Sequence, residues 1–136
     1  MKMSTKGRYA VTAMFDLASE GVGVPISAAV ISKRQKISLS YLEQLLNKLK
    51  RAGLIKTLKG PSGGYSLAKE PTKISVGDIV RATEGPVALA DCTSKGTCCP
   101  KSGCCSTKSL WTSLSKKVSA LLDETSLADL CQKGKR

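Results

Sequence analysis

Residues 38–67, SLSYLEQLLNKLKRAGLIKTLKGPSGGYSL, predict a helix, a strand, a glycine-rich turn and a returning strand. Apolar residues recur in the helix at the three- and four-residue spacing of one buried face: Leu42, Leu45, Leu46 and Leu49. Ser40, followed three residues later by Glu43, predicts a capping box at the start of this helix. Gly53 predicts its end, because glycine adopts the left-handed C′ conformation without steric cost.

A small hairpin is expected after this helix. Residues 54–59, LIKTLK, alternate two faces, residues 60–64 have the composition of a tight turn, and residues 65–67 resume the strand period. A helix beside a hairpin is the outline of a winged helix-turn-helix, in which the helix enters the major groove of DNA and the wing contacts the backbone or minor groove. The open alternative is a helix and a hairpin in any small α+β domain.

Helical patterns surround this segment. We expect helices over residues 5–18, over residues 28–35 behind the cap residue Ser27, and over residues 76–83 behind the cap residue Ser75. The segment 36–39 would be the turn of the helix-turn-helix. The predicted fold class is therefore mainly α with a small β-hairpin wing.

A long amphipathic helix is expected from Leu110, with a short closing turn through Leu130 and a basic tail after it. Its apolar stripe consists of Leu110, Trp111, Leu114, Val118, Leu121 and Leu122. Such a stripe can cover the core of its own chain or pair with a second copy. We favour a dimerisation helix, because a winged helix already has enough elements to close its core. The expected domains are a winged helix-turn-helix at 1–83, a cysteine-rich sensor loop at 84–108, and a dimerisation helix and tail at 109–136.

The charge of the chain is strongly positive. The net charge is +12, and residues 1–70 hold 12 Lys or Arg against 4 Asp or Glu. This excess fits a polyanionic partner such as double-stranded DNA, although an anionic membrane surface would also attract it. Lys6 and Arg8, at the start of the first helix, are candidate phosphate contacts. No apolar run is long enough to span a bilayer and no export signal is evident, so we expect a cytoplasmic protein without a membrane partner.

Five cysteines lie within 14 residues, and the chain has no histidine: the cluster is Cys92, Cys98, Cys99, Cys104 and Cys105. In a reducing compartment, clustered cysteines more often bind metal or do redox chemistry than form structural disulfides. Thiolates at this density suit zinc or iron in an iron–sulfur cluster. Neighbouring cysteines cannot easily point at one ion, so the two doublets would be alternatives or spares. An iron–sulfur cluster is favoured, and zinc or a metal-free thiol switch remain open.

Four segments of the chain are very similar to the iron–sulfur cluster regulators of the IscR type, a winged-helix family that also includes NsrR and CymR. The matching segments are residues 4–14, 37–45, 60–65 and 92–111, and the likeness extends to about residue 130. The pairing of SLSYLEQL with GPSGGY at this separation is the most specific part. The resemblance implies a homodimeric transcription regulator that dimerises through its long C-terminal helix and senses through a cluster in the preceding loop.

The resemblance also assigns roles to residues. Those that match the DNA-reading helix are Ser38, Ser40, Tyr41, Glu43 and Gln44, and Glu43 corresponds to the residue linked to discrimination between two operator classes. Lys59 occupies a wing position at which the family often has arginine, and lysine keeps the charge without the planar fork. Expected partners are an operator, a second copy of the chain and iron–sulfur assembly machinery.

The cysteine loop departs from the family pattern. Members like IscR hold a 2Fe–2S cluster with three cysteines and a histidine, whereas the histidine position falls here on Thr107 or Lys108, depending on the count. The fourth ligand would therefore come from a spare cysteine, from a carboxylate such as Asp91, or from outside the chain. Two rivals remain, a metal-free thiol- or sulfur-responsive repressor of the same fold and a zinc-stabilised nucleic-acid-binding protein. We expect no enzyme, because the chain lacks a histidine base, a phosphate loop and a nucleophile constellation.

Overall fold

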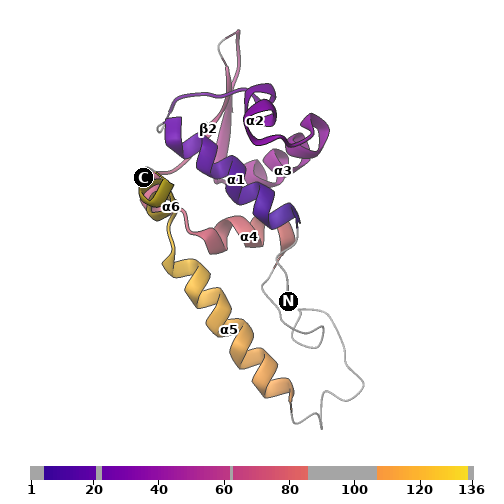
Figure 1. The fold of residues 1–136 in the computed structure, drawn as a ribbon, viewed down its shortest axis with the longest axis vertical. Coiled ribbons are helices and arrows are strands. Elements are labelled where there is room, and N and C mark those ends of the chain that lie inside the picture. The colour runs from indigo at the N-terminus through magenta and orange to yellow at the C-terminus, as the bar shows by residue number, and fades with distance from the viewer. Residues whose placement is uncertain (1–4, 21–22, 62, 86–106, 135–136) are drawn as a thin grey trace.

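The computed structural model describes residues 5–20, 23–61, 63–85 and 107–134 (Figure 1). The elements in chain order are α1 (Thr5–Glu20), α2 (Ala28–Gln35), α3 (Leu39–Arg51), β1 (Ile55–Leu58), β2 (Gly64–Leu67), the 3₁₀ turn η1 (Pro71–Lys73), α4 (Val76–Glu84), α5 (Lys108–Glu124) and α6 (Leu127–Gly134). The described part of the chain is mainly helical with one antiparallel hairpin, which confirms the predicted fold class.

The core lies around α1, which crosses the centre of the body in Figure 1. Met14 and Leu17 of α1 are fully buried, and the four leucines predicted for the inner face of α3 are all buried. Removing such a side chain from water contributes about 1.5–3 kcal/mol, so this face holds α3 firmly against the body. Ile79 of α4 and Leu127 of α6 belong to the same buried cluster.

Local contacts hold both the start of α2 and the turn that joins α2 to α3. The Ser27 hydroxyl accepts a hydrogen bond from the Val30 N–H at 3.3 Å, which confirms the predicted cap of α2. Lys36 then adopts the left-handed conformation, with φ 56° and ψ 44°. Ile37 is buried, and its carbonyl accepts a hydrogen bond from the Ser32 hydroxyl at 2.5 Å. These contacts set the path of the chain into α3.

The predicted capping box of α3 is wrong. The helix begins at Leu39, with Ser38 at the N-cap position and no side-chain cap bond, so Ser40 lies in the first turn. The Leu42 N–H donates to the Ser38 carbonyl at 2.9 Å. The reason is tertiary: burial of Ile37 directs the chain before Ser40 is reached. The predicted helix end is confirmed, since Gly53 follows the C-cap residue with φ 80°.

The wing is attached to the segment before α2. β1 and β2 pair from Ile55 with Leu67 to Leu58 with Gly64. Beyond this hairpin, the Tyr65 N–H donates to the Ile26 carbonyl at 2.8 Å, and the Ile26 N–H donates to the Tyr65 carbonyl at 2.9 Å. A Cβ on Gly64 would lie 2.5 Å from the Ile26 carbonyl, so only glycine permits this approach. The hairpin is thereby held beside the helix-turn-helix.

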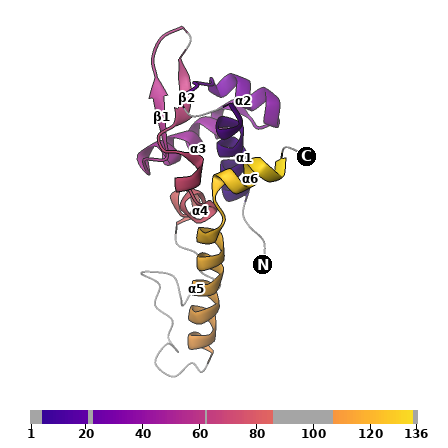
Figure 2. The ribbon, with the colours of Figure 1, turned by 90° about the vertical axis from the view of Figure 1, so that its left-hand side faces the viewer.

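The last two helices have different positions. α5 extends away from the body, and its first turn and the hairpin tip lie at opposite ends of the molecule (Figures 1 and 2). It begins at Lys108, two residues before the predicted start. α6 returns to the body and continues beyond the predicted end at Leu130. Ser126 and Asp129 form a capping box at its start, with bonds of 3.1 and 3.0 Å, and Leu127 is fully buried. Within the described ranges, no helix is long and apolar enough to cross a membrane.

Candidate nucleic-acid interface and cysteine segment

The first half of α3 presents polar side chains to solvent. Ser38, Ser40, Glu43 and Gln44 are all exposed, while the leucines on the opposite face are buried in the core. The structure therefore brings together four of the five residues predicted for the reading helix on one outward surface. Side chains of these types can donate to or accept from base edges and phosphates.

Tyr41, the fifth residue predicted for this surface, is half-buried. Its ring meets that of Tyr9 edge to face, with centroids 5.9 Å apart and planes at 88°. Edge-to-face pairs are favourable beyond the area that they bury. Tyr41 thus fixes the first turn of α3 against α1, and its exposed part adjoins Ser40 and Gln44 on the helix surface.

A buried carboxylate holds α2 against α1. Asp16 is 3% exposed and accepts hydrogen bonds from Arg34 Nη1 at 2.8 Å and Gln35 Nε2 at 3.2 Å. Arg34 also pairs with Glu20 at 2.9 Å. The hydrogen bond to Asp16 is the main cause that raises the pKa of the Arg34 guanidinium. This clamp was not predicted from the sequence, although an aspartate beside the apolar stripe of α1 was a signal for a buried partner.

The predicted basic contacts lie on exposed surface. Lys6 and Arg8 are exposed in the first turn of α1, and Lys59 is exposed directly after β1. Lys6 also lines a shallow cavity of about 480 Å³ with Tyr41 and Glu84, so the start of α1, the start of α3 and the end of α4 meet there. Four further exposed lysines on the helix-turn-helix and wing were not among the predicted contacts: Lys33, Lys36, Lys50 and Lys56.

The five clustered cysteines, and the proposed alternative ligand Asp91, lie outside the described residues. The described flanks are Gly85, which ends α4, and Thr107, which precedes α5. Among the described residues there is no group of three Cys, Asp or Glu side chains that could hold a metal ion. Cys131 is half-buried in α6.

Comparison with known proteins agrees with this fold. The chain is 46% identical over 130 residues to the HTH-type transcriptional regulator IscR of Aliivibrio salmonicida, covering 96% of this chain and 77% of that protein. The structure of IscR from T. potens is similar with a TM-score of 0.79 and 40% identity, covering 99% of this chain and 89% of that one. CymR, the global cysteine regulator of B. subtilis, is similar with a TM-score of 0.79 and 38% identity over 98% of both chains.

These relatives are transcriptional regulators and not enzymes. The family model for Rrf2, an iron-dependent transcriptional regulator, matches residues 3–133. That match covers both the helix-turn-helix and the C-terminal helices. The chain belongs to the Rrf2 family of DNA-binding transcriptional regulators.

Proposed function

We propose that this regulator reads an operator through the exposed first half of α3 and senses an iron–sulfur cluster held by its cysteine segment. The observation that carries the DNA-binding part is the outward polar surface of Ser38, Ser40, Glu43 and Gln44 on a helix whose other face is buried. The helix would lie in the major groove, and Lys59 on the wing would contact the backbone or minor groove. Lys6 and Arg8 would contact phosphates.

Selection from a random duplex library tests this part of the proposal. The full chain, purified anaerobically, is expected to enrich a sequence made of two half-sites, because a dimer presents two copies of α3. If the chain enriches no sequence and binds all duplexes with an affinity that depends only on salt, sequence reading by α3 is contradicted.

Glu43→Ala is expected to change which operator is preferred more than it changes general affinity. Because α3 starts after Ser38, the capping-box position is Tyr41, and Glu43 is exposed one turn further on. A carboxylate there can accept from the cytosine amino group. Competition binding on a panel of enriched duplexes measures the preference, with Glu124→Ala on α5 as the control of equal charge. An equal loss on every duplex would contradict base reading by Glu43.

Lys59→Ala is expected to weaken binding to all duplexes and to lower the slope of log affinity against log salt by about one. Lys59 follows β1 and is exposed, so its loss removes a charge from the wing without disturbing the core. Lys117→Ala removes the same charge from α5, away from the wing, and is expected to leave the slope unchanged. A slope unchanged by Lys59→Ala would remove Lys59 from the phosphate contacts.

The exposed face of α5 supports dimerisation. α5 packs on α4, where Arg81 contacts Ser119 and Asp123, while Leu110, Trp111 and Leu121 are 49%, 38% and 63% exposed. A helix that leaves three large apolar side chains this exposed is typical of one that pairs with another surface. Because oligomers of identical chains are commonly two-fold dimers, the proposed occupant is α5 of a second copy.

The cysteine segment is the proposed cluster site. Five thiols at positions 92, 98, 99, 104 and 105 supply enough soft donors for a 2Fe–2S cluster without histidine, so the donor chemistry fits the group. When bound, the cluster supplies a redox-sensitive centre. The chain itself joins this segment to α4 at Gly85 and to α5 at Lys108, so ligation would constrain both helices. Assembly machinery that delivers clusters is the proposed partner.

The likeness to CymR favours a second candidate. CymR is the global cysteine regulator of B. subtilis, and its fold matches this chain at 38% identity. The same five thiols could then respond directly to oxidants or sulfur compounds, without metal. Metal analysis separates this candidate from the cluster.

A further inference from the structure

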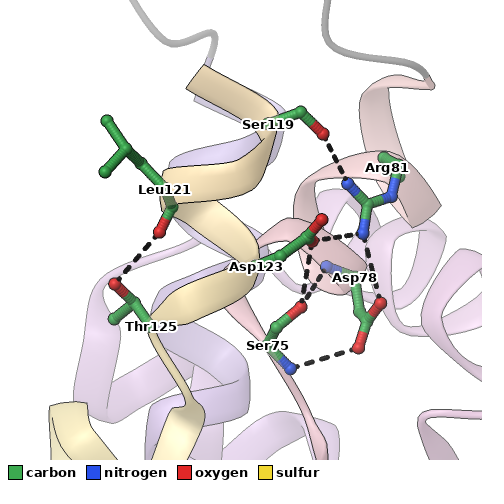
Figure 3. Close-up of polar contacts among 7 residues, drawn as sticks. All are labelled: Ser75, Asp78, Arg81, Ser119, Leu121, Asp123 and Thr125. Carbon is green, nitrogen blue, oxygen red and sulfur yellow. Dashed lines mark hydrogen bonds and ion pairs between the residues drawn. The ribbon is translucent and has the colours of Figure 1, made fainter. Parts of the chain in front are cut away.

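A polar contact joins α4 of the DNA-binding body to α5. Arg81 of α4 donates to Asp123 Oδ1 at 2.5 Å and to the Ser119 hydroxyl at 3.0 Å (Figure 3). It also reaches Asp78 at 3.4 Å, within its own helix. Asp123 accepts a further bond from the Ser75 hydroxyl at 3.5 Å. The bond to Asp123 is the main cause that raises the pKa of the Arg81 guanidinium. We call the four residues Arg81, Ser119, Asp123 and Gly77 the α4–α5 joint.

Gly77 allows the carboxylate to reach this place. A Cβ built on Gly77 would overlap Asp123 Oδ1 and would lie 3.2 Å from both terminal nitrogens of Arg81. The absence of a side chain therefore makes the space in which the carboxylate and guanidinium meet. Asp123 also lies beside the first turn of α4, where the helix dipole favours negative charge.

The base of α5 is secured by other means. The Val76 N–H donates to the Thr125 carbonyl at 2.8 Å, and the Leu127 N–H donates to the Ile74 carbonyl at 2.8 Å. Leu127 is fully buried. Arg81 and Asp123, by contrast, keep 33% and 46% of their side-chain exposure, and ion pairs this exposed contribute little to folding stability. The backbone bonds and the core hold α5 in place. The remaining role of the joint is to set the angle between α5 and the body.

We infer that the α4–α5 joint sets the distance and rotation between the two recognition helices of the dimer, and so selects the spacing of the half-sites. The inference rests on the proposed dimerisation through α5. α5 is fixed to the body at its last turns and projects at its first turns (Figures 1 and 2). A small change of angle at the base therefore becomes a large displacement of one body relative to its partner. Half-site spacing is a geometric property of the two bodies, so the joint acts as a positioning element for DNA recognition.

Two variants perturb the joint differently. Asp123→Ala removes the carboxylate, whereas Gly77→Ala keeps every polar group and displaces the carboxylate with one methyl group. Neither should prevent folding, because Asp123 is exposed and alanine is a better helix former than glycine. Glu124→Ala removes the same charge from the next residue, which is outside the joint, and serves as the control.

The experiment measures binding of each full-length protein to duplexes whose enriched half-sites are separated by the optimal spacing or by two base pairs more or fewer. Wild type and Glu124→Ala are expected to prefer the optimal spacing by about tenfold or more, and both joint variants by less than about threefold. Binding to a single half-site is expected to be equal in all four proteins, and sedimentation should show four dimers. If the joint variants are dimers and keep the wild-type spacing preference, the inference is wrong and the proposed dimer stands. A monomeric wild type would overturn the proposed dimer and the inference with it.

Discussion

Trp111→Glu is expected to convert the proposed dimer into a monomer and to weaken operator binding by about 100-fold or more, because two linked half-site contacts become one. Trp111 is 38% exposed on α5, next to Leu110 and on the same side of the helix as Leu121. In the proposed interface it would be buried against the partner's α5. Burying a carboxylate there without a partner charge is strongly unfavourable, so association should fail before folding does.

Sedimentation velocity and binding to the two-half-site operator measure this effect. The control is Ala120→Glu, which adds the same charge to an exposed position on a different side of α5. It is expected to remain dimeric, and single half-site binding should be equal in both variants. A dimeric Trp111→Glu protein with wild-type affinity would contradict dimerisation through this face.

Replacing both members of a cysteine doublet is expected to remove nearly all bound iron. Cys98→Ser combined with Cys99→Ser leaves three thiols in the segment, fewer than the four that an all-cysteine cluster needs. A single replacement within the doublet leaves four, and most of the iron should be retained. The same contrast is expected for Cys104 and Cys105.

Iron and sulfide per subunit, measured after anaerobic purification, test the doublets. Cys131→Ser is the matched control, because this residue lies in α6 and outside the cysteine segment. It is expected to keep the wild-type iron content. Wild-type iron in both double variants would show that the segment is not the cluster site, and equal losses in single and double variants would contradict the idea of spare ligands.

Much of the fold was predictable from local patterns. The leucine spacing of α3, the cap residues Ser27 and Ser75, and the end at Gly53 all depend on neighbouring residues, and each is confirmed. The start of α3 was not predictable in this way. Ser40 and Glu43 have the capping-box spacing, but burial of Ile37 places the first turn earlier. A contact with distant residues outweighed a local signal.

The exposed surface of the candidate interface was also predictable from local patterns, whereas the ion pairs behind it were not. The exposed polar residues of α3 follow from its periodicity, since one face of an amphipathic helix must remain in water. The pair of Asp16 with Arg34 and the pair of Arg81 with Asp123 join residues 18 and 42 positions apart. Nothing in the sequence near either partner identifies the other. These long-range pairs required the structure.

The most direct test of the central claim is metal analysis of the full chain after anaerobic purification, with iron, sulfide and zinc measured and a visible absorption spectrum recorded before and after exposure to air. We expect iron and sulfide in equal amounts, about two of each per subunit, with a visible band that bleaches in air. Zinc in place of iron, or a metal-free protein, would contradict the cluster and leave a thiol switch or a static zinc site on the same DNA-binding fold.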